Sequence, residues 1–274
     1  MIQFRGRVAL VTGAGRGLGR AYAKAFAEHG AAVIVHDAGV ERGGEGGEPA
    51  VADAVVEEIH AAGGTAIPSY ENLSSEEGCV ALVERAAAQL GRLDIVVNNA
   101  GLVIYEEIDE ARRSWEVMRS VQIDAPFHVS RIAFSIMKQQ KYGRLVFTTS
   151  GIAMSAEDTR PGLAAYCAGK MGQFGLMIVF AAEGREHGIL ANAIAPVAAT
   201  RVYTRHAEPG ELEPEQVVPG VLFLASEECD VSGVVLSAAG GRFDRRSWTR
   251  SDGIDFGRDP VEPDELARRW AELH

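Results

Sequence analysis

Cysteine is scarce in this chain, and its distribution argues against a disulfide-rich, a redox-active or a zinc-binding protein. The 274 residues include three cysteines, Cys79, Cys167 and Cys229, which are far apart and odd in number. No group of them has the spacing of a disulfide framework, a redox pair or a zinc site. We therefore expect reduced thiols, a cytoplasmic location and no bound metal.

Long apolar runs and an excess of positive charge are also lacking. The longest candidate run, Leu176 to Ala182, is far too short to cross a bilayer. The N-terminal residues lack the apolar core of a signal peptide, so no export signal is expected. The net charge of -11 argues against nucleic acid or an anionic membrane as the main partner, although Arg242, Arg245 and Arg246 leave room for a local basic patch.

The composition shows no break that would divide the chain into separate domains. Hydrophobic residues make up 47% and charged residues 24% of the sequence, which is ordinary for a globular protein. No internal repeat is visible. A chain of this length can form one large α/β domain.

One glycine-rich stretch near the start organises the rest of the sequence. Val8 to Val11 is a short apolar run that suits a buried parallel strand. Glycines follow at alternate positions from Gly13 to Gly19, and a helical pattern runs from Arg20 to His29. A strand that turns on glycines into a helix directs free backbone N–H groups and a positive helix end at one place, which suits a pyrophosphate. A purely structural glycine turn is the alternative interpretation.

The spacing of these glycines departs from the strict fingerprint GxGxxG, because Leu18 occupies the place of its third glycine. The spacing fits the variant Thr-Gly-x-x-x-Gly-x-Gly, read at Thr12, Gly13, Gly17 and Gly19. In this motif the chain resembles the short-chain dehydrogenase/reductase family. The resemblance implies a Rossmann-type, doubly wound α/β fold with a mainly parallel sheet and a bound nicotinamide dinucleotide.

An acidic residue follows the second expected strand. Asp37 lies 24 residues after Gly13, close to the distance at which a carboxylate meets the adenosine ribose in such folds. That carboxylate can accept both ribose hydroxyls and repels the 2′-phosphate of NADP, so NAD is expected. Arg16 instead favours NADP, because a basic residue in the turn can neutralise the 2′-phosphate. A solvated aspartate at a strand end is the alternative for Asp37.

Further segments are expected to complete the cofactor site. Asn72-Leu73 stands where the family usually carries Asp and an aliphatic residue around the adenine. Asn99-Ala100-Gly101 belongs to an Asn-Asn-Ala-Gly signature of the family, in which small residues let the backbone pass close to the nucleotide. Val197 replaces the glycine of a Pro-Gly pair that would lie against the nicotinamide, and Thr200 follows it. The expected cofactor-binding residues are Gly13, Arg16, Gly17, Leu18, Gly19, Asp37, Asn72, Leu73, Asn99, Ala100, Gly101, Tyr166, Lys170, Val197 and Thr200.

The acid–base chemistry is expected at the start of a long helix. Tyr166 and Lys170 are four residues apart, so they share one helix face and the phenol lies beside the ammonium. Proton transfer near neutral pH needs a tyrosine pKa lowered by roughly 3 units, about 4 kcal/mol, and a fixed cation can supply part of this. Ser150, at the end of the preceding strand, can donate to a substrate oxygen. Ser150, Tyr166 and Lys170 match the catalytic set of the family.

The interval from Ser150 to Tyr166 is a few residues longer than usual in the family. Thr149 or Ser155 could therefore take the role of Ser150. The additional residues, from Ala156 to Pro161, are expected to alter the rim of the substrate pocket.

Gln122 stands where many members of the family carry an Asn that helps to hold a proton-relay water. It lies seven residues after the aromatic Trp115. Glutamine has the same donor and acceptor groups as asparagine and one more methylene. A catalytic relay role and a packing role both remain open for Gln122.

The periodic segments alternate between strands and helices, as a doubly wound fold requires. The expected strands are 8–11, 31–35, 65–70, 94–97, 143–149, 189–195 and 234–237, the last of which should be the final strand. The expected helices are 20–29, 51–62, 80–90, 115–141 with a bend at Pro126, 166–184, 214–225 and 263–273. The loop 39–49 could fold over the cofactor, and 203–214 is the usual place for a substrate lid.

Three segments narrow the resemblance to one branch of the family. These are Arg7–Val35, Gly143–Arg144 and Ile194–Arg201. They look most like the (3R)-hydroxyacyl-CoA dehydrogenase domain of peroxisomal multifunctional enzymes type 2 and its bacterial relatives. We expect a Rossmann domain over residues 1–245 and a tail with a short helix over 246–274.

The resemblance implies an enzyme that transfers a hydride between NAD and a secondary alcohol or ketone, which could be a 3-hydroxyacyl-CoA. Arg16 keeps open an NADPH-dependent ketoreductase. Gln122 and Val197 keep open a protein that binds NAD(H) without catalysis. The family further implies a small-molecule substrate and a homo-oligomer, either dimer or tetramer, and neither nucleic acid nor a membrane is expected as a partner.

Overall fold

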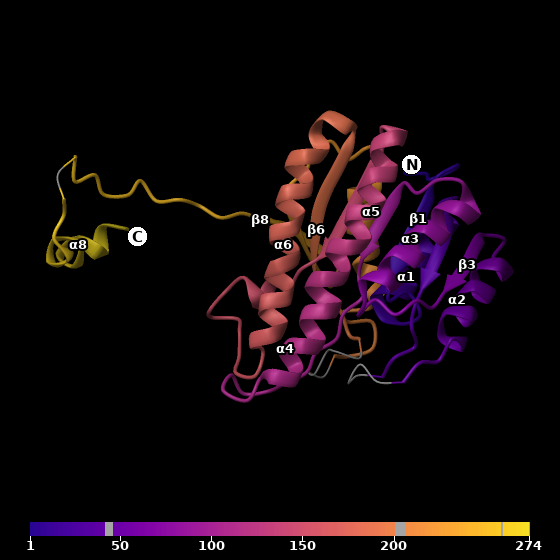
Figure 1. The fold of residues 1–274 in the computed structure, drawn as a ribbon, viewed down its shortest axis with the longest axis horizontal. Coiled ribbons are helices and arrows are strands. Elements are labelled where there is room, and N and C mark those ends of the chain that lie inside the picture. Colours follow the sequence, from indigo (N-terminus) through magenta and orange to yellow (C-terminus); the bar gives the residue numbers. More distant parts are fainter. Residues whose placement is uncertain (42–45, 201–206, 259, 274) are drawn as a thin grey trace.

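The strands form one sheet that is covered by helices on both faces (Figure 1). The computed structural model describes residues 1–41, 46–200, 207–258 and 260–273. Within these residues the sheet has eight strands in the order β3-β2-β1-β4-β5-β6-β7-β8. The strands are β1 Val8–Thr12, β2 Ala32–His36, β3 Thr65–Ser69, β4 Ile95–Asn98, β5 Gly143–Thr148, β6 Ile189–Val197, β7 Val235–Ala239 and β8 Arg242–Arg246.

The first seven strands are parallel, and β8 is antiparallel to β7. The strand order reverses between β1 and β4. In a doubly wound sheet, the crevice outside the carboxyl ends of the strands at such a reversal is where ligands bind. The predicted doubly wound α/β fold is therefore confirmed.

The helical elements alternate with the strands along the chain. The α-helices are α1 Gly17–Glu28, α2 Ala50–Ala61, α3 Glu76–Leu90, α4 Arg112–Arg119, α5 Ala125–Gln140, α6 Ala164–Gly184, α7 Val218–Ala225 and α8 Pro263–Arg269. A π-helical turn, η1 Ser120–Asp124, joins α4 to α5. The 3-10 turns are η2 Gly151–Ala153, η3 Arg185–His187, η4 Pro214–Gln216 and η5 Trp270–Leu273.

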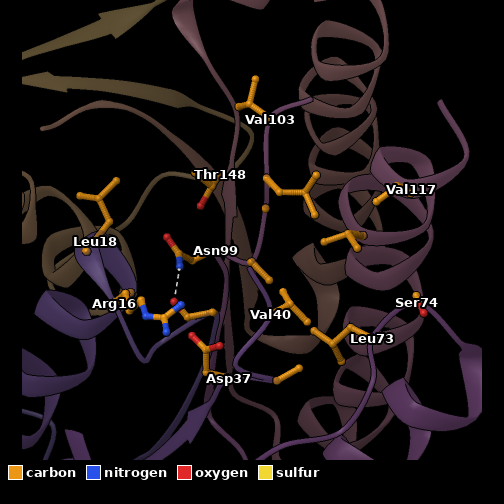
Figure 2. Close-up of a pocket in the computed structure, with 18 of the residues that line it drawn as sticks. Arg16, Leu18, Asp37, Val40, Leu73, Ser74, Asn99, Val103, Val117 and Thr148 are labelled. Carbon is orange, nitrogen blue, oxygen red and sulfur yellow. Dashed lines mark hydrogen bonds between the residues drawn. The ribbon is translucent and has the colours of Figure 1, made fainter. Parts of the chain in front are cut away.

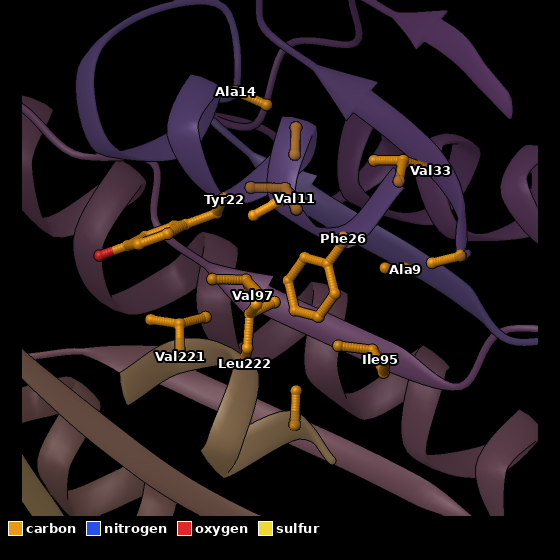
Figure 3. Close-up of a cluster of buried hydrophobic side chains, with 14 of the residues drawn as sticks. Ala9, Val11, Ala14, Tyr22, Phe26, Val33, Ile95, Val97, Val221 and Leu222 are labelled. Carbon is orange, nitrogen blue, oxygen red and sulfur yellow. The ribbon is translucent and has the colours of Figure 1, made fainter. Parts of the chain in front are cut away.

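The helices divide between the two faces of the sheet. On one face α1, α2 and α7 enclose a core in which Tyr22 and Phe26 lie close to Val97, Val221 and Leu222 (Figure 3). On the other face α3, α5 and α6 cover a second core. Both faces of the parallel strands are thus buried, which explains why these strands are apolar runs with little alternation.

The expected helix from residue 115 to 141 is divided into three elements. It begins as α4, passes through η1 and continues as α5. The helix stays continuous and departs from α geometry in the π-helical turn just before Pro126, whose missing N–H cannot make the regular α-helical hydrogen bond. Gln122 lies inside the π-helical turn.

The expectation that residues 234–237 form the final strand is wrong. β8 follows β7 through a two-residue turn of Gly240 and Gly241, whose φ angles are +54° and +77°. A Gly-Gly turn suits a tight hairpin, because both positions need positive φ. The expected domain boundary at residue 245 thus falls inside β8.

Several helices begin earlier than their apolar pattern indicates. Helix α1 begins at Gly17 instead of Arg20, and α3 begins at Glu76 instead of Val80. At the start of α3 the Ser75 hydroxyl accepts a hydrogen bond from the Gly78 N–H at 3.1 Å, which is an N-cap.

Beyond β8 the chain leaves the body of the molecule. Figure 1 shows it extending away from the sheet to α8, which lies apart from the other elements. Near the start of this arm, residues 247–258 and 260–273, the Trp248 ring packs on Phe174 of α6, with ring centroids 4.4 Å apart. Further along, Leu266 and Trp270 are exposed.

One helical stretch, Ala164–His187, is long and apolar enough by length and composition to cross a membrane. It comprises α6 and η3. Met177 and Ala181 of α6 are buried against the sheet, and 33% of the apolar window of this stretch is buried. The length and composition of this stretch are therefore only a weak indication of a membrane span.

Candidate active site

A cavity of about 1070 Å³ lies at the carboxyl ends of the central strands. It extends from the glycine turn after β1 past the ends of β2 and β4 to the start of α6. Figure 2 shows Arg16, Asp37, Leu73, Asn99 and Thr148 around it. Most of the expected cofactor-binding residues line this cavity, namely Gly13, Arg16, Gly17, Leu18, Gly19, Asp37, Asn72, Leu73, Asn99, Ala100, Gly101, Tyr166, Lys170 and Thr200. Val197 is not among the described residues that line it, although its neighbours Pro196 and Ala198 are.

Glycine is required at the start of the turn after β1 and in the first turn of α1. Gly13 has φ +64°, and a Cβ there would lie 2.9 Å from the Ala100 Cα. A Cβ on Gly19 would lie 2.1 Å from the Gly13 carbonyl oxygen. Backbone therefore packs against backbone at the start of α1, which leaves the helix N-terminus open toward the cavity.

Thr12 and Asn99 hold this turn in place. The Thr12 hydroxyl accepts hydrogen bonds from the Asn99 and Ala100 N–H groups, both at 3.0 Å. The Asn99 side-chain amide donates to the carbonyl oxygens of Thr12 and Gly13, at 2.9 and 3.1 Å. The Asn99 amide thus fastens β1 to β4, a bracing role that spacing in the sequence does not reveal.

Asp37 is almost fully buried, at 9% exposure, at the end of β2. Its two carboxylate oxygens accept hydrogen bonds from the Gly15 N–H at 2.9 Å and the Gly39 N–H at 2.8 Å. The carboxylate is therefore held in one orientation in the cavity wall. The Arg16 guanidinium lies 3.6 Å from the Glu48 carboxylate, so its charge already has a partner.

Asn72 and Leu73 lie across the cavity from the glycine turn. The Asn72 side-chain oxygen accepts hydrogen bonds from the Ser74 N–H and hydroxyl, at 2.9 and 2.8 Å. Leu73 is buried beside it. Asparagine thus supports this turn without adding a charge to the cavity wall.

Tyr166 and Lys170 face the same cavity from the first turns of α6. The Lys170 ammonium lies 5.8 Å from the centre of the Tyr166 ring and donates to the Thr148 carbonyl oxygen at 2.9 Å. Lys170 is only 5% exposed, and this burial lowers the pKa of its ammonium to about 8. Burial also raises the pKa of the Tyr166 phenol, and a hydrogen bond with Ser150 opposes that rise.

The three candidate hydroxyls make different contacts, and of the three residues Thr149 lines the cavity. The Thr149 hydroxyl donates to the Lys170 carbonyl oxygen at 2.9 Å. The Ser155 hydroxyl accepts from the Glu157 N–H at 3.2 Å in a surface turn. Ser150, which is buried, is the hydroxyl that interacts with the Tyr166 phenol.

Gln122 is fully buried beneath the cavity, outside its lining within the described chain. Its amide nitrogen donates to the Leu102 carbonyl oxygen at 2.9 Å. Its amide oxygen has no hydrogen-bond partner among the residues that the structure describes. A Cβ on Gly101 would lie 3.3 Å from the Lys170 Nζ and 3.9 Å from the Gln122 Cδ, so both groups approach one point.

Two residues near Lys170 were not predicted from the sequence. The Thr148 carbonyl oxygen binds the Lys170 ammonium, and the Thr148 N–H donates to the Gln173 side chain at 3.1 Å. Gln173 is buried on α6, close to one turn beyond Lys170. Neither residue belongs to a motif, and only the spacing of Gln173 from Lys170 could have indicated it.

The expected lid, 203–214, lies partly outside the described residues, which omit 201–206. The same holds for the loop 39–49, of which 42–45 are omitted. Gly46 and Gly47 line the cavity beside Val40.

The arrangement fits a nicotinamide dinucleotide. A glycine turn and a helix N-terminus lie at one point of the cavity, a buried carboxylate lies at the end of the neighbouring strand, and a tyrosine with a buried lysine lies at the far end. These are, in order, groups suited to a pyrophosphate, a ribose and a site of proton transfer.

The sequence matches a family model described as short chain dehydrogenase over residues 7–209. A short-chain type dehydrogenase/reductase of Mycobacterium tuberculosis is 38% identical, over 97% of this chain and 93% of that protein. The peroxisomal multifunctional enzyme type 2 of Mus musculus is also 38% identical, over 99% of this chain. The chain spans 37% of the length of the mouse protein.

A solved structure resembles the whole chain. It is a short chain dehydrogenase from Mycobacterium avium, with a TM-score of 0.86 and 36% identity. The match covers 98% of this chain and 95% of that one. The resemblance to this family and to multifunctional enzymes type 2 is thereby confirmed.

Proposed function

This chain belongs to the short-chain dehydrogenase family and is an oxidoreductase acting on CH–OH groups, and we propose that it interconverts a secondary alcohol and a ketone with NAD. The observation that carries the proposal is the cavity itself, in which Asp37 lines one end and Tyr166 and Lys170 line the other. The alternative of a protein that binds NAD(H) without catalysis is not favoured, because its proton-transfer groups are intact.

In the proposed mechanism Tyr166 is the acid and base. Its phenolate accepts the hydroxyl proton when an alcohol is oxidised, and its phenol donates a proton to the oxygen when a ketone is reduced. A bound nicotinamide would supply the hydride acceptor for the oxidation and the hydride donor for the reduction. The ammonium of Lys170 favours the phenolate form of Tyr166 electrostatically, and it would hold the nicotinamide ribose. The Ser150 hydroxyl, beside the phenol, donates to the substrate oxygen and orients it.

Gln122 offers a route for the proton beyond Lys170. Its amide oxygen is buried and has no partner within the described chain, and its amide carbon approaches the same point at Gly101 as the Lys170 Nζ. A buried acceptor beside an ammonium favours donation toward it, directly or through one water. We assign Gln122 to the proton path on this ground.

The preference for NAD rests on the charges at the ribose end. Asp37 is held by two backbone N–H groups and would repel a 2′-phosphate, while Glu48 neutralises Arg16. Arg16 still lines the cavity, and this observation favours the second candidate, an NADPH-dependent ketoreductase.

The substrate is proposed to be a 3-hydroxyacyl-CoA or a similar secondary alcohol. The support is the branch of the family that the sequence resembles and the relative named multifunctional enzyme type 2. Apolar side chains on the substrate side of the cavity, Leu102, Val103, Val117 and Val121, suit a carbon chain.

One experiment tests cofactor and substrate together. Purified protein is titrated with NAD and NADP while NADH or NADPH fluorescence is followed, with 3-hydroxyacyl-CoAs and simple secondary alcohols as substrates. We expect turnover with NAD and at least tenfold weaker use of NADP. Asp37→Asn keeps the shape of the side chain and removes its charge. This variant should show a smaller preference for NAD over NADP. Efficient NADPH-dependent turnover by the unmodified protein would favour the ketoreductase, and NADH binding without any turnover would refute the catalytic proposal.

We also propose that the protein is a cytoplasmic homo-oligomer, a dimer or tetramer. Only 33% of the apolar window in Ala164–His187 is buried, and Ile178 and Val179 of α6 are exposed. The arm leaves the body beside the same helix, at the Trp248–Phe174 contact, and carries an exposed Trp270. A helix as short as α8 gains little stability in isolation, which favours its packing on a second copy.

Light scattering on the full chain tests the oligomer. The chain has a mass of 29.3 kDa, and we expect a particle at least twice that size. Val179→Glu, which places a charge on the exposed face of α6, should shift the population toward the monomer. A monomeric wild-type protein at micromolar concentration would refute the proposal.

A further inference from the structure

Two segments far apart in the sequence meet beside the entrance of the cavity. One follows β4 and contains Tyr105 and Glu106. The other, the loop 155–162, supplies the additional residues between Ser150 and Tyr166. The Glu106 N–H donates to the Gly162 carbonyl oxygen at 3.2 Å. This bond joins the two segments into one wall.

The Tyr105 side chain lies directly on this loop. A Cβ on Gly162 would lie 3.5 Å from the Tyr105 Cδ1 and 3.6 Å from its Cβ, which is ordinary van der Waals distance. Gly162 has φ +81°, a conformation that glycine adopts without strain. The loop therefore passes beside the tyrosine, and a side chain at position 162 would touch it.

The wall is also fastened to α4. The Glu106 carboxylate accepts from the Ser114 N–H at 2.8 Å, at the start of that helix. A wall that is tied down selects ligands by bulk, because it yields little to a larger group.

Tyr105 lines the same cavity as Tyr166, and 47% of its surface is exposed to solvent. It also acts electrostatically on the Tyr166 phenol, whose pKa it raises slightly. On the substrate side the cavity is otherwise lined by aliphatic side chains such as Leu102 and Val117.

We propose that Tyr105, backed by Gly162, is the residue that determines substrate specificity at this site. Its ring limits the width of the carbon chain next to the reacting carbinol, so unbranched secondary alcohols are admitted and bulky ones are excluded. This inference rests on the proposed function.

The test uses two isomeric alcohols of equal size but different width, 2-hexanol and 3,3-dimethyl-2-butanol. The dissociation constants of both alcohols from the NADH-loaded protein are measured by NADH fluorescence. This measurement requires no turnover. Their kcat and KM with NAD are measured in parallel. Tyr105→Ala removes the wall, and Tyr105→Phe keeps the ring and removes the hydroxyl.

We expect the wild-type protein to bind 2-hexanol roughly tenfold or more tightly than its isomer. Tyr105→Ala should reduce that ratio to about threefold or less, through KM more than kcat, and Tyr105→Phe should restore it. The affinity for NADH should be the same in all three proteins.

A wild-type ratio near one, or a ratio that Tyr105→Ala leaves unchanged, would overturn the role of Tyr105. Loss of the ratio in Tyr105→Phe as well would also overturn it, since the ring would then not be the selecting group. If neither alcohol is oxidised, the proposed activity fails on these substrates, while the binding ratio still decides the role of Tyr105.

Discussion

Tyr166→Phe should lose nearly all turnover while the fold and NADH binding are retained. The change removes one hydroxyl at the only position where the described cavity brings a phenol next to a buried ammonium. General acid–base catalysis contributes roughly 10²–10⁴-fold, so we expect kcat to fall by about 10³-fold. Steady-state kinetics with any substrate that the wild-type protein oxidises, together with NADH titration, provides the measurement.

Tyr22→Phe is the matched control for this experiment. Tyr22 is fully buried in the core on the α1 face, and its hydroxyl has no hydrogen-bond partner among the described residues. Its loss should leave kcat unchanged and stability equal or slightly higher, because an unpaired buried hydroxyl costs free energy. If Tyr166→Phe kept wild-type turnover, the assignment of the acid and base to this residue would be wrong.

Lys170→Met should lower activity and raise stability at neutral pH. Burial moves the pKa of the Lys170 ammonium from its usual 10.5 to about 8. Below pH 8 the lysine is charged in both folded and unfolded protein, and the folded state bears the full penalty of burying that charge, ~3 kcal/mol at 1.4 kcal/mol per pKa unit. Between pH 8 and 10.5 the folded protein releases the proton first, so the penalty fades as pH rises.

Methionine has a similar length and no charge. We expect Lys170→Met to be ~1–2 kcal/mol more stable at pH 7 after loss of the hydrogen bond to Thr148, which corresponds to a melting temperature a few degrees higher. The advantage should shrink toward pH 10. Turnover should fall by roughly 10²-fold or more, because Tyr166 loses its neighbouring cation.

Thermal unfolding at pH 7 and pH 10 provides the measurement for this variant. Lys138→Met, at an exposed position on α5, is the control and should change stability little at either pH. A Lys170→Met protein that is clearly less stable at pH 7 would show that the burial of this charge is compensated by its surroundings.

The alternation of strands and helices was predictable, because a parallel sheet buries both faces and its strands appear as apolar runs. β8 was not, because Arg242–Arg246 is charged and exposed. Its position depends on pairing with β7, and only the Gly240-Gly241 turn signals that hairpin. The start of α1 at Gly17 was missed for a related reason: glycine is a poor helix former, and the close packing of Gly19 on the Gly13 carbonyl and the Asn99 side chain overrides that preference.

The candidate site was predictable where a motif covers it and not where it depends on tertiary contacts. Tyr166 and Lys170 follow from helical spacing. The bracing of the glycine turn by Thr12 and Asn99 joins residues that are 87 positions apart. The contact of Tyr105 with Gly162 likewise depends on how two loops meet, which no local pattern encodes.

The arginines of β8 have a consequence for aggregation. The outer edge of a sheet carries unpaired N–H and C=O groups that can recruit a strand from another molecule. At this edge the strand is only five residues long and includes Arg242, Arg245 and Arg246. Stacking a second copy strand against strand would bring these like charges together. Uncontrolled pairing of β8 edges into fibres is therefore disfavoured.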